Sequence, residues 1–168
     1  MKARLVGIKD PGILEIILGM ESIFPQELGY GEEDVIRNLS NSRNFNIIVE
    51  NDNGEPIGYI LGIPHTDAVI SLGHDDPIME NHDGRKIYVD QLAVVADERD
   101  SEHVVFKFLV SSLAKEAKRA GYKRWSAHLA MGLQFIIDEM YRGRIIASRR
   151  VRLASCGNLP FAYREGEI

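Results

Sequence analysis

The sequence predicts a single α/β domain, and three observations support this. A chain of 168 residues, 45% of them hydrophobic, can bury roughly 70% of its unfolded surface in one core. Residues 92–96 form the continuous apolar run of a central strand, and a helix with one apolar face follows them. Two strand-like segments also flank an Asn53-Gly54 turn. No repeat or low-complexity segment interrupts the chain, so residues 1–168 are expected to form one domain.

The N-terminal part should contain one strand and two helices. Residues 4–8 alternate weakly, as in a strand. Asp10 supplies a helix N-cap and Pro11 a first helical residue, so a helix is predicted to begin there and to end at Phe24-Pro25. A shorter helix is predicted over residues 32–39.

The middle of the chain should contain a hairpin, a central strand and the best-defined helix. Residues 45–49 and 57–63 are the hairpin strands, because Asn-Gly accepts the positive φ angles of a tight turn. The central strand covers residues 86–95. Asp100 or Ser101 can cap the following helix, and Gly121 suits its left-handed C-cap.

The C-terminal part should contain three strands and a helix. A strand is predicted over residues 122–129 and a helix over residues 133–141. Residues 145–153 and 159–163 form a closing hairpin that turns at Cys156-Gly157-Asn158.

Composition excludes several classes of protein. The only cysteine, Cys156, cannot form an intramolecular disulfide, which predicts a reducing, cytoplasmic location. The most apolar run, residues 13–20, is too short to span a membrane and contains Glu15, so no membrane association is expected. A net charge of −5 argues against broad nucleic-acid binding.

The element order, and above all the segment from Tyr88 to Gly121, resembles the GNAT superfamily of acetyl-CoA-dependent N-acyltransferases. In that family a strand ending in Leu-x-Val precedes a loop of pattern Arg/Gln-x-x-Gly-x-Gly/Ala. Leu92-Ala93-Val94 fits the strand end and Arg99 the first loop position. The resemblance implies an α/β (α+β) fold with a mixed, mostly antiparallel central sheet of about six or seven strands and about four helices. It also implies acetyl-CoA (coenzyme A) as co-substrate and no metal.

The family's loop holds the cofactor pyrophosphate with backbone amides, and glycines allow the close approach. Here Glu102 and Val104 replace those small residues. Glu102 either repels the diphosphate or faces solvent at the start of the helix. The cofactor-binding residues implied by the resemblance are Leu92, Ala93, Val94, Arg99, Asp100, Ser101, Glu102, His103 and Val104.

The resemblance also implies catalytic roles. In the family a strand carboxylate acts as a base through water, a tyrosine on a later helix acts as an acid, and a strand amide holds the thioester oxygen. These roles fall on Asp90, Tyr141 and the Val94 amide. The alternatives are a solvated or hydrogen-bonding aspartate and a packing tyrosine.

Residues 64–90 form a long acidic insertion where the family has a short turn. The insertion is interpreted either as the border of an acceptor pocket for a cationic amine or as a solvated loop. His65, His74 and His82 match no standard metal-ligand spacing, so solvated histidines are favoured over a metal site.

The C-terminal arginines and His128 are best interpreted as structural residues. The arginines at 142, 144, 149, 150 and 152 suit a solvated strand face, with partner, nucleic-acid or cofactor-phosphate contact as alternatives. His128, at a strand end, is expected to be packed or hydrogen-bonded rather than catalytic.

The function predicted from the resemblance is an N-acetyltransferase. It would transfer an acetyl (acyl) group from acetyl-CoA to a primary amine of a small molecule or peptide, by direct attack in a ternary complex. The alternative is a non-catalytic GNAT-like module used for ligand sensing, dimerisation or partner binding. A homodimer is a possible assembly in either case.

Overall fold

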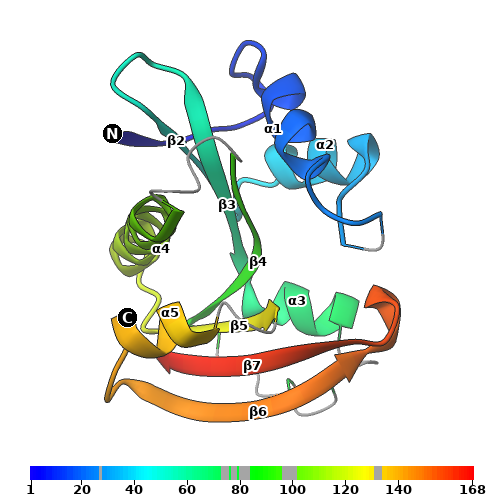
Figure 1. The fold of residues 1–168 in the computed structure, drawn as a ribbon, viewed down its shortest axis with the longest axis vertical. Coiled ribbons are helices and arrows are strands. Elements are labelled where there is room, and N and C mark those ends of the chain that lie inside the picture. Colours follow the sequence, from blue (N-terminus) through cyan, green and yellow to red (C-terminus); the bar gives the residue numbers. More distant parts are fainter. Residues whose placement is uncertain (27, 73–75, 77–78, 80–83, 96–101, 131–133) are drawn as a thin grey trace. The chain divides into compact units, whose positions relative to one another are not determined.

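The computed structural model describes residues 1–26, 28–72, 76, 79, 84–95, 102–130 and 134–168, and these form seven strands and five α-helices (Figure 1). The strands are β1 (Lys2–Leu5), β2 (Phe45–Glu50), β3 (Pro56–Pro64), β4 (Lys86–Val94), β5 (Arg124–Ala130), β6 (Ile145–Leu153) and β7 (Leu159–Glu167). The helices are α1 (Ile13–Glu21), α2 (Glu32–Ser40), α3 (His65–Leu72), α4 (Glu102–Arg119) and α5 (Gln134–Met140). The expected mixed α/β class is confirmed.

The strands follow the order β1-β2-β3-β4-β5-β7-β6. Neighbours β1–β2, β2–β3, β5–β7 and β7–β6 are antiparallel, whereas β4 and β5 are parallel. A mostly antiparallel sheet of seven strands therefore agrees with the prediction. One helix more than expected is present, because α3 occupies the start of the segment that was interpreted as a loop.

The N-terminal turn differs from the prediction. Helix α1 begins at Ile13 and its N-cap residue is Gly12, in the left-handed conformation at φ 70°. Asp10 does not cap the helix, because its carboxylate accepts the N–H of Gly7 at 2.7 Å. That local bond closes a turn directly after β1, which explains why the strand ends at Leu5 rather than at Ile8 and why the helix begins only at Ile13.

The glycine-containing turns agree with the prediction. In the β2–β3 hairpin Gly54 has φ 83°, and after α4 Gly121 has φ 92° with its N–H donated to the Lys118 carbonyl. Gly157 and Asn158 at the β6–β7 turn have φ 64° and 59°. These residue types adopt the left-handed region at low cost, so the sequence marks the turns directly.

Contacts within the chain define two compact units. The first comprises Met1–Gly62 and Gln91–Glu116, and the second Ile63–Asp90 and Ala117–Ile168. In the first unit the buried Glu21 carboxylate accepts hydrogen bonds from the Tyr59 hydroxyl and from the Tyr30 N–H. The expectation that residues 1–168 behave as one domain stays a prediction.

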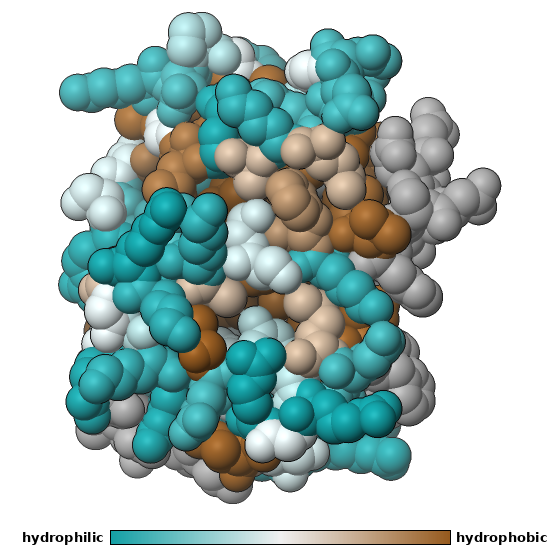
Figure 2. All heavy atoms as spheres, turned by 90° about the vertical axis from the view of Figure 1, so that its left-hand side faces the viewer, coloured by the Kyte–Doolittle hydropathy of each residue, from teal (hydrophilic) through white to brown (hydrophobic). Residues whose placement is uncertain are grey.

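A groove of about 380 Å³ lies in the first unit. Its apolar floor is formed by Leu5, Ile47 and Phe108, and Arg4 and Lys115 contribute charged groups. Figure 2 shows hydrophobic residues gathered between hydrophilic ones in the upper half of the face that it presents. None of the described helices is both long and apolar enough to cross a membrane.

Candidate functional site

The second half of β4 carries three of the predicted cofactor-binding residues. Ala93 is buried, while Leu92 and Val94 are half-buried. The Val95 N–H donates to the Ile57 carbonyl at 2.9 Å, which attaches the C-terminal end of β4 to β3. Successive N–H groups of an extended chain point to opposite edges, so the Val94 N–H points away from β3.

The position of α4 depends on Gly58 in β3. A Cβ atom at Gly58 would lie 2.9 Å from the Ala93 carbonyl oxygen and 3.1 Å from Cδ1 of Leu109. Val105 of α4 lies nearly as close, at 3.3 Å. The missing side chain thus allows the first turns of α4 to pack directly on β3 and β4. Sequence reasoning did not anticipate this role.

The predicted cofactor loop is only partly described. Arg99, Asp100 and Ser101 lie outside the described residues. Glu102 and His103 are the first residues of the α4 backbone. Val104, where the family has glycine or alanine, exposes 55% of its surface. The first N–H groups of a helix have no acceptor within the helix, so those at this end of α4 depend on acceptors outside it.

The two predicted catalytic residues belong to the second unit. Asp90 is half-buried on β4. Tyr141 directly follows α5, is only 5% exposed, and its ring lies 4.8 Å from that of Trp125. The Arg144 guanidinium lies 4.8 Å from the centroid of the same tyrosine ring. Burial raises the pKa of Tyr141, so its phenol stays protonated at neutral pH.

The register of the β4–β5 pair shows on which face of these strands Asp90 and Tyr141 lie. In the parallel β4–β5 pair, Ile87 is opposite Trp125 and Tyr88 is opposite Ser126. Side chains alternate along a strand, so Asp90 shares the face of Tyr88, whereas Tyr141 packs on the face of Trp125. The structure therefore does not bring Asp90 and Tyr141 together on one face.

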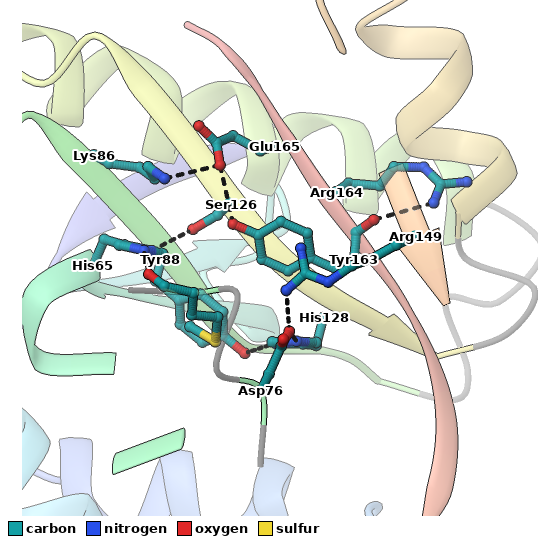
Figure 3. Close-up of polar contacts among 11 residues, drawn as sticks. His65, Asp76, Lys86, Tyr88, Ser126, His128, Arg149, Tyr163, Arg164 and Glu165 are labelled. Atoms are coloured by element: carbon teal, nitrogen blue, oxygen red, sulfur yellow. Dashed lines mark hydrogen bonds and ion pairs between the residues drawn. The ribbon is translucent and has the colours of Figure 1, made fainter. Parts of the chain in front are cut away.

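A series of buried, hydrogen-bonded polar side chains lies on the face of β4 and β5 that carries Tyr88 (Figure 3). It was not predicted. His128 contacts the Tyr88 hydroxyl through Nδ1 at 2.9 Å and the Asp76 carboxylate through Nε2 at 2.9 Å. Arg149 of β6 also pairs with Asp76, and its guanidinium lies 3.9 Å from the Tyr163 ring centroid. The expectation that His128 is hydrogen-bonded agrees with these contacts, but its partners could not be foreseen.

A second polar cluster lies beside the first (Figure 3). His65 contacts the Ser126 hydroxyl through Nδ1 and the Met79 carbonyl through Nε2, both at 2.8 Å. Lys86 donates to Glu165 at 2.8 Å, with none of the lysine side chain exposed. His65 thus belongs to the packed interior rather than to a solvated loop.

Hydrogen-bond chemistry assigns both histidine tautomers. A carbonyl and a carboxylate only accept, so Nε2 carries the proton in His65 and in His128. The Nδ1 atoms then accept from the Ser126 and Tyr88 hydroxyls. Burial lowers the pKa of both histidines and raises that of Tyr88 well above its usual value, which favours these neutral forms.

No group of three His, Cys, Asp or Glu side chains in the described part of the chain is arranged to hold a metal ion. Of the three histidines considered for metal binding, His65 has both ring nitrogens occupied. His74 and His82 lie outside the described residues.

Solved structures resemble the chain over nearly its full length. An aminoglycoside 6'-N-acetyltransferase complexed with coenzyme A is 16% identical, with 99% of this chain and 97% of that chain covered and a TM-score of 0.67. A GCN5-related N-acetyltransferase from Kribbella flavida is 13% identical, with coverage of 99% and 97% and a TM-score of 0.63. This chain has the GNAT fold.

A third GNAT-fold structure is the ribosomal-protein-S18-alanine N-acetyltransferase from Escherichia coli. It is 12% identical, with 99% of this chain and 93% of that chain covered and a TM-score of 0.66. No protein-family model and no curated protein match the sequence significantly. The resemblance inferred from Leu92-Ala93-Val94 and the element order is therefore confirmed at the level of the GNAT fold.

Proposed function

We propose that this protein is an N-acetyltransferase that transfers an acetyl group from acetyl-CoA to a primary amine of a small molecule or peptide. The proposal rests on the GNAT fold, which extends over nearly the whole chain and is shared with N-acetyltransferases, one of them complexed with coenzyme A. The amine attacks directly in a ternary complex, without a covalent enzyme intermediate.

The cofactor is assigned to the end of β4 and the start of α4. Unpaired amides at a helix N-terminus bind phosphate oxygens, so residues 99–104 are proposed to hold the pyrophosphate. Leu92, Ala93 and Val94 are proposed to lie along the acyl end. The Val94 N–H, which points away from β3, is the proposed donor to the thioester oxygen. When bound, acetyl-CoA supplies the activated acetyl thioester.

Acid–base roles are proposed for Asp90 and Tyr141. The amine nitrogen bonds to the carbonyl carbon while the carbon–sulfur bond breaks. Asp90 takes the amine proton through a water molecule, and the Tyr141 phenol donates a proton to the departing thiolate.

The acceptor is proposed only as a class. The similar structures include enzymes named for an aminoglycoside and for a ribosomal-protein alanine, which are a small-molecule and a protein amine. A preference for a cationic amine cannot be attributed to Asp76 of the insertion, because Arg149 neutralises that carboxylate.

The first experiment is a thermal-unfolding scan with and without acetyl-CoA. A ligand at about one hundred times its Kd adds roughly 2.7 kcal/mol to the free energy of unfolding, which for this length raises Tm by roughly 5–10 °C. Release of free thiol is then measured with a panel of primary amines. A saturable Tm shift together with amine-dependent thiol release supports the proposed enzyme.

A non-catalytic GNAT-like module is the second candidate. Glu102 and Val104 favour it, since they stand where the family's pyrophosphate loop has small residues. An unchanged Tm at millimolar acetyl-CoA would favour this module, whose role would be ligand sensing, dimerisation or partner binding.

A further inference from the structure

The C-terminal segment that contains the β6–β7 hairpin is basic, although the chain as a whole is acidic. Six arginines and two glutamates give residues 142–168 a formal charge of +4. The whole chain carries −5, so residues 1–141 carry −9. Such segregation creates a local positive field on a protein whose overall charge repels anions.

Strand β6 is the last in the strand order (Figure 1). Its pairing with β7 runs from Ile145 opposite Gly166 to Leu153 opposite Leu159. On its other edge no strand is paired, within the part of the chain that the structure describes. That edge presents backbone N–H and C=O groups over a nine-residue strand, which is the template for adding a further strand.

The side chains of β6 alternate in exposure. Ile146, Ser148, Arg150 and Arg152 are exposed, whereas the intervening residues up to Val151 are half-buried. Arg149 belongs to the half-buried set, and its guanidinium is already engaged by Asp76. The register with β7 shifts between Ile145 and Ala147. From Ser148 to Arg152 the exposed positions recur every two residues, about 6.6–6.8 Å apart, which is also the same-face spacing of an extended peptide.

Four arginines on this strand and the turn before it keep their side chains exposed. They are Arg142, Arg144, Arg150 and Arg152. Arg152 donates one Nη to the Asn158 carbonyl at 2.8 Å, and its remaining guanidinium N–H groups can bind another acceptor. No ion pair engages any of the four among the residues that the structure describes. Their charge is therefore available to an anionic partner.

We propose that the free edge of β6 docks an extended acidic segment of another protein, which adds to the sheet as a strand. Charge favours this partner over a second β6, because two basic hairpins repel each other. A polypeptide also uses both the donors and the acceptors of the edge, whereas a nucleic-acid backbone uses only donors. The exposed Ile146, at 51%, offers an apolar contact between the charged positions.

A fluorescent octapeptide of alternating glutamate and valine tests the proposal by anisotropy titration. Saturable binding is expected, weakened about tenfold or more by the double variant Arg150→Glu with Arg152→Glu. The matched control, Arg37→Glu with Lys118→Glu, makes the same change in net charge at exposed positions on α2 and α4 and should leave the affinity unchanged. Circular dichroism verifies that each variant is folded.

A second comparison separates strand addition from charge alone. The same peptide with every backbone N–H methylated keeps all its carboxylates, so it should bind at least about tenfold more weakly. Equal affinity of the methylated peptide, equal loss in the control variant, or tighter binding of an oligothymidylate of the same charge would each overturn the proposal. So would a β6-dependent dimer seen by sedimentation. None of these outcomes depends on acetyl transfer.

Discussion

The Asp76 carboxylate accepts a hydrogen bond from Nε2 of His128 at 2.9 Å, with only 3% and 2% of the two side chains exposed. Arg149 pairs with the same carboxylate. The contact joins the insertion to β5 and β6. It gives a structural role to an acidic residue that sequence reasoning assigned to the border of a pocket or to a solvated loop.

Replacing Asp76 should destabilise the protein. Asp76→Ala leaves a buried imidazole N–H and a partly buried guanidinium without their acceptor, so we expect a loss of about 3–5 kcal/mol in the free energy of unfolding. Urea denaturation measures it. The control is Asp52→Ala, which breaks an ion pair with the Met1 amino group at a 94% exposed side chain. That variant should keep nearly all of its stability, because exposed ion pairs contribute little.

Because of the two buried histidines, we expect the free energy of unfolding to decrease as the pH falls. Burial lowers the pKa of folded His65 and His128 below 6.5, so the unfolded chain binds more protons in this range. Their contribution is complete above pH 6.5 and is lost as the pH falls through and below 6.5 towards the folded pKa. The slope should reach up to about 1.4 kcal/mol per pH unit for each histidine.

Urea titrations between pH 7.5 and 5.5 measure this slope, and His128→Gln should make it shallower. Asp76, Arg149, Tyr88 and Tyr163 surround His128, and Asp76 opposes the lowering that burial causes. Glu21 has the opposite sign, because burial raises its pKa and its contribution is lost as the pH rises above 4.5. An unchanged slope in His128→Gln would contradict the prediction.

Gly58→Ala should destabilise the packing of α4. The new methyl group would meet the Ala93 carbonyl at 2.9 Å, so we expect a loss of about 1–3 kcal/mol, measured by thermal unfolding. Gly19→Ala is the matched control in α1, where a Cβ meets nothing within 4 Å. It should gain about 0.5–1 kcal/mol from helix propensity. A neutral Gly58→Ala would show that α4 moves away at no cost.

If Asp90 is the base and Tyr141 the acid, replacing either residue should lower turnover without weakening the binding of acetyl-CoA. Asp90→Asn and Tyr141→Phe should each lower kcat at least about a hundredfold and leave the affinity for acetyl-CoA nearly unchanged. Steady-state kinetics with calorimetry measures both quantities. Tyr122→Phe is the control for loss of a tyrosine hydroxyl. Parent-level turnover in both variants would remove the two role assignments.

Glu102→Gly tests the unusual cofactor loop. If Glu102 faces the pyrophosphate, removing its charge should tighten acetyl-CoA binding by about five- to tenfold, measured by calorimetry. Glu102→Gln separates charge from backbone freedom, because it removes only the charge. An affinity equal to that of the parent in both variants would mean that Glu102 points away from the cofactor.

Local signals in the sequence predicted most of the fold. Gly54, Gly121 and Gly157 adopt the left-handed conformations expected of them, and the apolar run of β4 is a central strand. Asp10 was misassigned because an aspartate before proline suits a turn as well as an N-cap, and only the geometry shows which N–H it accepts. Helix α3 was missed because its eight residues carry a weak pattern beside acidic loop residues.

The candidate site was predictable only where it resembles a family motif. Nothing in the sequence around His128 reveals Asp76, 52 residues away, or Arg149 on a different strand. Likewise Gly58 has no local turn to justify it, and its role depends on α4 crossing β3. Such contacts are set by the register of distant elements, which single-sequence patterns do not encode.

The buried pairs of the second unit also bear on how the chain folds as it is synthesised. His65 and Ser126 are 61 residues apart, and Lys86 and Glu165 are 79 apart. Contacts between such distant residues form slowly, since a long loop must close before they stabilise anything. The interior charge of Lys86 has no carboxylate from β7 until that strand leaves the ribosome. While β7 is still inside the ribosome, the second unit lacks both this ion pair and the strand that lies between β5 and β6.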